Sequence, residues 1–256
     1  MIPNRGLWMS PTYPLLFALG TLAGLGWLLL MDPQRRSKGA RLDPDAASLL
    51  RLDAGLAALT SGLAGARLGY VAAHAAYFAD HIGEAFILSA GGLSWVGGAL
   101  GALMGVAALA AFRRSSAWAL ADALAIPAAV LAAASWTGCL IDGCGFGRPL
   151  PAAVTSPFAS DIFDSRMPRW PTQLLGALAC FSLALGLLAL EPRGVRPGVL
   201  ACLTLTGLGL TALALSFTRG DPLPLWGGVR LDAIGAALIA ALGLGGTVLR
   251  LRSSSA

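Results

Sequence analysis

The sequence has little charge and few side chains that could bind a metal ion. Only 12% of its 256 residues are Asp, Glu, Lys or Arg, whereas a soluble domain has about 25%. There are two histidines, His74 and His81, and four cysteines. The low charge excludes an ordinary soluble domain. The few metal-binding side chains predict no metal site, and because no cofactor motif or nucleotide-binding loop is present we expect no cofactor.

What the sequence does contain is long apolar runs, since 56% of its residues are hydrophobic. A helix that crosses a bilayer needs about 20 apolar residues. Seven runs meet this length and predict an all-α, polytopic membrane protein with a single domain over residues 1–256. The predicted spans are Tyr13–Met31, Leu52–Ala73, Leu93–Phe112, Trp118–Ile141, Pro171–Leu190, Gly198–Phe217 and Leu231–Leu249.

The basic residues predict how these spans are oriented. Eleven Lys and Arg residues fall on one side of the membrane, at 33–51, 113–114, 193–196 and 250–252, against six on the other side. Because cytoplasmic loops are enriched in Lys and Arg, we expect the N-terminus outside and the C-terminus in the cytoplasm. The net charge of +5 therefore reflects membrane topology, and we expect no nucleic-acid partner.

The most informative segment is 136–148, where the fourth predicted span runs into a glycine-rich turn that opens the outer loop 142–170. Irregular backbone at membrane depth is tolerated only where protein or a water-filled cavity satisfies it, and charges there are functional candidates. The turn holds two, Asp142 and Arg148. It also holds Cys139 and Cys144, which predict either small buried residues or a disulfide. A disulfide requires the helix to end between them.

Four segments, together with Tyr13 at the start of the first span, resemble motifs of the bacterial prolipoprotein diacylglyceryl transferase family. They are Gly-Ala-Arg-Leu-Gly-Tyr-Val at 65–71, Gly-Gly-Leu-Ser-Trp-Val-Gly-Gly at 91–98, Asp-Gly-Cys-Gly-Phe-Gly-Arg at 142–148 and Pro-Arg-Trp-Pro-Thr-Gln-Leu at 168–174. The resemblance implies a plasma-membrane enzyme with a lipid cavity. Such an enzyme transfers diacylglyceryl from phosphatidylglycerol to the cysteine thiol of a lipoprotein precursor.

The resemblance also implies site residues. Arg148 and Asp142 are expected to be catalytic, and substrate binding is expected at Tyr13, Arg67, Gly97, Gly98, Gln173 and Arg219. Some of these side chains have a second interpretation. Arg67 would either contact a phosphate or lock a broken helix through its carbonyls. The two glycines would admit either a lipid headgroup or a neighbouring helix. The outer arginines would form either an electropositive rim or solvated pairs with nearby aspartates.

The sequence also departs from the family's motifs. The family's histidine before Gly-Gly is Val96, its signature arginine is Trp136, and its glutamate is Cys144. Arg and His can neutralise a phosphate or move a proton, whereas Val and Trp cannot. Two hypotheses follow. One is a divergent enzyme that acts on phospholipids. The other is a catalytically inactive, lipid-binding or structural subunit of a larger membrane complex, with other membrane proteins as partners.

The topology can be tested with cysteines introduced at Ser37 and Ser156. In intact cells, a membrane-impermeant thiol reagent should label Ser156→Cys and leave Ser37→Cys unlabelled, because the positive-inside rule places residues 33–47 in the cytoplasm. Labelling at Ser37→Cys alone would reverse the orientation.

Overall fold

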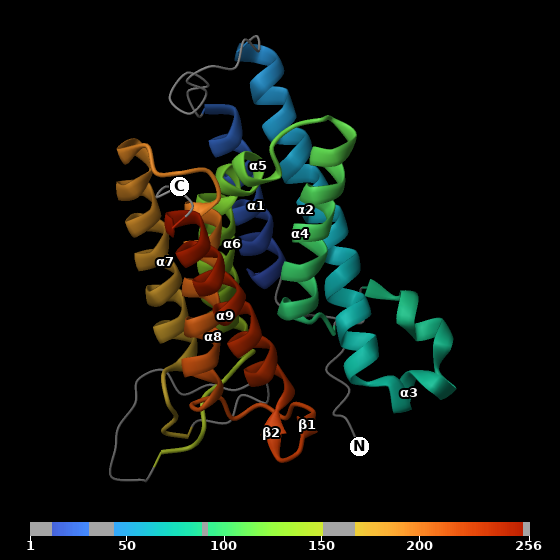
Figure 1. Ribbon diagram of the computed structural model, residues 1–256. Helices are drawn as coiled ribbons and strands as arrows, with labels where there is room; N and C mark the ends of the chain where they lie inside the picture. Colours follow the sequence, from blue (N-terminus) through green and yellow to red (C-terminus); the bar gives the residue numbers. More distant parts are fainter. Residues whose placement is uncertain (1–11, 31–43, 89–91, 151–166, 253–256) are drawn as a thin grey trace.

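The structure, a computed structural model, describes residues 12–30, 44–88, 92–150 and 167–252 and is almost entirely helical (Figure 1). Among these residues, seven helices are long and apolar enough to cross a membrane. They are α1 (Thr12–Leu30), α2 (Pro44–Ala73), α4 (Trp95–Phe112), α6 (Ala125–Asp142), α7 (Thr172–Leu190), α8 (Val199–Ser216) and α9 (Leu231–Arg252). The predicted all-α, multi-pass architecture is therefore confirmed.

Shorter elements join these helices. They are α3 (Ala75–Asp80), η2 (Ile82–Phe86), α5 (Ala117–Ala123), η4 (Glu191–Arg193), β1 (Leu225–Trp226) and β2 (Val229–Arg230). The prediction of one continuous span over Trp118–Ile141 was wrong, because α5 ends and α6 begins on either side of Leu124. Pro127 explains the break, since proline lacks an N–H and is tolerated only in the first turn of a helix.

The helices run up and down, so that one end of the bundle gathers the start of α1, the end of α2 and the end of α6, together with the β1–β2 hairpin (Figure 1). We call it the disulfide end, after the Cys139–Cys144 bond described below. Ser37 and Ser156 lie outside the described residues, so the orientation of the bundle in the membrane stays a prediction.

Glycines bring α2 and α4 into direct backbone contact. A Cβ atom added to Gly97 would overlap the carbonyl oxygen of Gly65, and one added to Gly65 would overlap that of Gly97. Gly98 lies next to the same seam, with its virtual Cβ 3.4 Å from the Cβ of Ala66. Small residues permit this approach in a membrane, where van der Waals packing holds helices together.

At the opposite end, the carboxylate of Asp122 in α5 caps α8. Its Oδ2 accepts a hydrogen bond from the Gly198 N–H at 2.7 Å, and its Oδ1 accepts one from the Ala201 N–H at 2.8 Å. Asp122 is 5% exposed. The first N–H groups of a helix have no partner within the helix, and this carboxylate from another segment accepts hydrogen bonds from two of them. Its negative charge also interacts favourably with the positive, N-terminal end of the α8 dipole.

We expect Asp122→Ala to lower the free energy of unfolding by about 2 to 3 kcal/mol, because two buried N–H groups lose a charged acceptor. Asp53→Ala is the matched control. Its ion pair with Arg113 is 38% exposed on the aspartate side, and such surface pairs contribute about 0–1 kcal/mol. Thermal unfolding in detergent measures both variants, and equal losses would show that Asp122 does not stabilise the fold through the cap.

Candidate functional site

The turn that leaves α6 is closed by a disulfide. Gly143 follows the helix with φ 78°, a left-handed conformation that glycine adopts without strain, and its N–H donates to the Cys139 carbonyl at 2.9 Å. The chain then doubles back, so that Cys139 and Cys144 have Cα atoms 4.6 Å apart and form a disulfide. Of the two alternatives that the sequence left open, the disulfide is the one the structure adopts, and α6 ends between the two cysteines.

Two polar contacts fasten the neighbouring helices to this turn. The Tyr13 N–H, in the first turn of α1, donates to Oδ2 of Asp142 at 2.9 Å. The Gln173 side chain at the start of α7 is 2% exposed and donates through Nε2 to the Cys144 carbonyl at 3.2 Å. Tyr13, Asp142 and Gln173, three of the predicted site residues, therefore meet at one turn.

Beyond the turn, the backbone pairs with two other segments. The Arg148 N–H donates to the Thr218 carbonyl at 2.7 Å, and the Gly220 N–H donates to the Phe146 carbonyl at 2.8 Å. On its other edge, the Trp170 N–H donates to the Arg148 carbonyl at 3.0 Å. Residues 146–149 are thus held between the segment after α8 and the segment before α7, which places Arg148 and Arg219 side by side.

The side chain of Arg148 is exposed at this junction. Its Nε donates to the backbone carbonyl of Arg219 at 3.2 Å. The two terminal guanidinium nitrogens form no hydrogen bond within the part of the chain that the structure describes. Arg148 is therefore held at its base and presents a forked cation outward, a form suited to a phosphate or a carboxylate.

Arg219 lies in a compact group of four charges with Asp221, Arg230 and Asp232. Its Nε and Nη2 contact the two carboxylate oxygens of Asp221 at 2.8 and 2.5 Å, and its Nη1 lies 3.5 Å from Oδ2 of Asp232. Arg230 contacts the same two carboxylates, and all four side chains are less than 20% exposed. Two positive charges therefore meet two negative ones, and the group is neutral.

Burial opposes the charge on Arg219 and would lower its pKa, but the hydrogen bond and the charge of Asp221, with that of Asp232, more than offset it and raise the pKa above its usual value. The guanidinium carbon also lies 6.0 Å from the ring centroid of Trp136. The indole thus stands beside this cation and can attract it through its π face. Arg219 is a fixed structural cation in this arrangement.

Arg67 and the two predicted glycines lie elsewhere, in the α2–α4 pair. Arg67 is 7% exposed and donates to the backbone carbonyls of Glu84, Ala85 and Gly92 at 2.5, 2.8 and 3.0 Å. Gly97 and Gly98 lie on the seam between the two helices. The predicted site residues therefore form two groups, one at the α6 turn and one around Arg67.

Arg230 and Asp232 were not predicted as members of the charged group. The signal that could have found them is a repeated Arg-x-Asp pattern, at Arg219–Asp221 and again at Arg230–Asp232. The β1–β2 hairpin, with Trp226 paired to Val229, brings the second copy back beside the first. Two adjacent basic–acidic pairs of this kind predict mutual neutralisation once a turn connects them.

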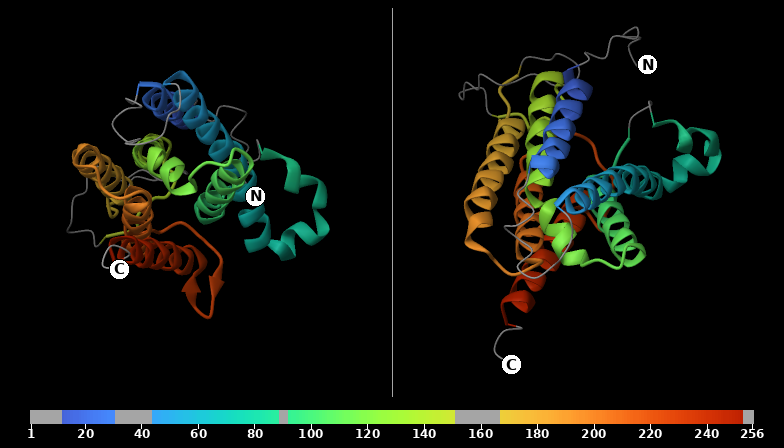
Figure 2. Two further views of the ribbon diagram at one scale, coloured as in Figure 1. Left: turned by 45° about the horizontal axis from the view of Figure 1, so that its top comes forward. Right: turned by 90° about the horizontal axis from the view of Figure 1, so that it is seen from above.

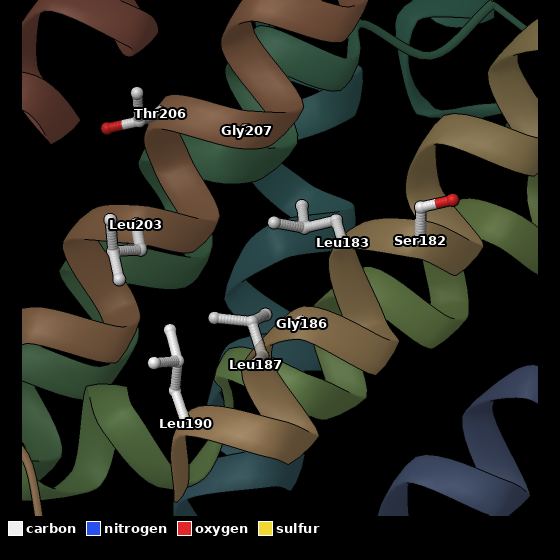
Figure 3. Close-up of a pocket in the computed structure, with 8 residues that line it drawn as sticks. All are labelled: Ser182, Leu183, Gly186, Leu187, Leu190, Leu203, Thr206 and Gly207. Carbon is white, nitrogen blue, oxygen red and sulfur yellow. The ribbon is translucent and has the colours of Figure 1, made fainter.

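A separate hollow of about 370 Å³ lies between α7 and α8, in the half of α7 farther from the disulfide end. Four leucines surround the gap between the two helices, namely Leu183, Leu187, Leu190 and Leu203 (Figure 3). Thr206 at its edge donates its hydroxyl to the Cys202 carbonyl at 2.8 Å. The lining of this hollow is mostly apolar, with the hydroxyls of Ser182 and Thr206 as its polar side-chain groups and no charged side chain. Within the described ranges, no three His, Cys, Asp or Glu side chains are grouped in a way that could hold a metal ion.

The fold defines a multi-pass α-helical membrane protein with a polar site at one end of the bundle. The chain belongs to the prolipoprotein diacylglyceryl transferase family, whose sequence model matches residues 9–249, nearly its whole length. The resemblance identified from the motifs is thereby confirmed. Comparison with curated proteins finds no match.

The disulfide should stabilise the fold, because it closes a short loop in the unfolded chain. For a loop of this length, the loss of chain entropy corresponds to about 2 kcal/mol. We expect the Cys139→Ser/Cys144→Ser variant to unfold at a lower temperature than the unmodified chain, and reductant to lower the unfolding temperature of the unmodified chain alone.

Alkylation of the denatured protein provides the control. Two thiols, those of Cys180 and Cys202, should react before reduction and four after it. Four reactive thiols before reduction would contradict the disulfide.

Proposed function

We propose that this protein transfers the diacylglyceryl group of phosphatidylglycerol to the cysteine thiol of a lipoprotein precursor, in the plasma membrane of a bacterium. The observation that carries the proposal is Arg148. Its guanidinium is held at Nε and is exposed, close in the chain to the turn where Asp142 and Cys144 bond Tyr13 and Gln173. Membership of the family supports the reaction type.

In this reaction, the thiol sulfur attacks the glycerol carbon that carries the phosphate. A C–S bond forms, the C–O bond to the phosphate breaks, and glycerol phosphate leaves with the electron pair. Arg148 would bind the phosphate and stabilise its growing charge, since preorganised cations act most strongly where charge develops. Asp142 would accept the thiol proton or hold the α1 start in place through the Tyr13 N–H.

The disulfide supports placing this end of the bundle on the outer face of the membrane, because disulfides persist in oxidising compartments and are rare in the cytosol. That placement agrees with the orientation expected from the Lys and Arg residues. Lipoprotein precursors would then meet Arg148 and Asp142 after translocation.

A second function is favoured by a different observation, the neutral charge group. Arg219 is engaged by Asp221 and Asp232, and Trp136 stands where the family motif has its signature arginine. A site with one outward cation in place of several would bind a headgroup without driving transfer. We therefore keep a second candidate, a non-catalytic lipid-binding subunit of a larger membrane complex.

We expect Arg148→Ala to reduce transfer about a hundredfold, because loss of a transition-state phosphate contact costs several kcal/mol. Arg193→Ala is the matched control, since Arg193 is exposed in η4 at the opposite end of the bundle and should leave the rate unchanged. The measurement is thioether formation on a lipobox peptide in phosphatidylglycerol vesicles.

Equal rates for the two variants would remove Arg148 from the mechanism. Absence of transfer by the folded, unmodified chain, with phosphatidylglycerol binding that depends on Arg148, would establish the second candidate. Restoration of lipoprotein maturation in cells depleted of their own enzyme would establish the first.

A further inference from the structure

The segment after α2, residues 74–88, forms a side arm that contains α3 and η2. Figures 1 and 2 show it projecting sideways beside α2, away from the other helices of the bundle. Arg67, six residues before the end of α2, donates to the carbonyls of Glu84 and Ala85. The far part of the arm therefore returns along α2 to the level of Arg67, about 9 Å before the helix end at a rise of about 1.5 Å per residue.

This return places irregular backbone beside an apolar span. α2 has 30 residues and is about 45 Å long, compared with a hydrocarbon core of about 30 Å. Carbonyls that lie against an apolar surface need partners within the protein. Arg67 supplies them to Glu84, Ala85 and Gly92, and its guanidinium carbon lies 5.4 Å from the ring centroid of Phe78. Arg67 is thus the internal donor that lets the arm lie at this level.

The arm is amphipathic. Its apolar side chains are strongly exposed, with Phe86 82% and Ile82 69% exposed. Two of its polar groups interact, since the Tyr77 hydroxyl donates to Oε2 of Glu84 at 2.7 Å, and a third, Asp80, is exposed at the end of α3. Such a segment binds at a membrane surface with its apolar face among the acyl chains and its polar groups among the headgroups.

A hollow of about 510 Å³ lies between the arm and α2. Its lining is apolar and includes Ala64, Leu68, Phe78, Ile82 and Phe86. The one charged side chain in the lining is that of Arg67, whose guanidinium already bonds three carbonyls. The hollow therefore suits hydrocarbon and not a phosphate headgroup.

We propose that this hollow holds one acyl chain of a bilayer phospholipid, with the apolar face of the arm seated in the same leaflet. The hollow is continuous with the exposed, apolar surface of α2, and this identifies its occupant as lipid. Leu68 in the lining is 69% exposed and belongs to the same membrane-spanning helix as Leu56 and Leu63, which are 46% and 45% exposed. Lipid that covers this helix extends without interruption into the hollow. The inference does not rest on the proposed transferase activity.

The test uses the full chain in phosphatidylcholine vesicles that contain a phospholipid with a photoreactive diazirine near the end of one acyl chain. After illumination, peptide mapping should find cross-links on the arm, at Ile82 or Phe86, and on Leu68. Ala64→Trp fills the hollow from α2, where Ala64 is exposed, and should remove most of the cross-links on the arm. Ala107→Trp, at an exposed position of α4, is the matched control and should leave them unchanged.

Cross-links on Leu56 and Leu63 with none on the arm would overturn the proposal, as would an unchanged pattern in a folded Ala64→Trp protein. If that variant does not fold, a second measurement decides. A fluorophore on Phe86→Cys should be quenched by lipids with spin labels in their acyl chains more strongly than one on Asp80→Cys. Equal quenching, or protection of Phe86→Cys that rises with protein concentration and so indicates a second copy of the chain, would contradict the acyl-chain site.

Discussion

The structure depends on one constraint, that backbone N–H and C=O groups at membrane depth must find partners without water. The helices meet it internally, but the chain departs from helical structure beside α2 and beyond α6. Arg67 supplies the donors beside α2. Beyond α6 the pairing of residues 146–148 with the segment around Thr218 and the side chain of Gln173 supply the partners, and the disulfide closes the turn. Both places, the segment beside α2 and the turn beyond α6, contain residues of the family motifs. In a membrane protein, the residues of a motif must stabilise the irregular backbone that holds the functional side chains.

Of the two arginines in the candidate site, Arg219 stabilises the structure and Arg148 is available to bind a ligand. Arg219 lies beside two carboxylates and an indole, so its charge is neutralised within the protein, and its ion pairs connect the end of α8 to the start of α9. Arg148 is anchored through Nε to the backbone of Arg219 and keeps an exposed guanidinium. A neutral, rigid base beneath one outward cation favours binding of a single anionic group over broad attraction of anions.

Much of the fold could be predicted from the sequence, because apolar length and motif order report directly on membrane spans. All seven spans were found, and the alternative of a disulfide between Cys139 and Cys144 was identified from their position five residues apart near the outer face, where an oxidising exterior permits it. The break at Leu124 and the side arm were missed, since α3 and η2 show no periodicity of their own and depend on Arg67. The grouping of Arg230 with Asp221 was also missed, because it requires a hairpin only two residues long in each strand.

The carboxylate of Asp122 has a consequence for biogenesis. A chain that emerges from its N-terminus presents Asp122 well before Gly198 and Ala201, the residues whose N–H groups it bonds. During that interval Asp122 has neither of these two partners, and a carboxylate without them favours a position near water. Insertion of α8 removes the cause of that preference. Synthesis of α8 thus supplies the hydrogen-bond donors that Asp122 requires. A ribosome-bound fragment that ends before residue 198 therefore contains Asp122 without these two hydrogen bonds.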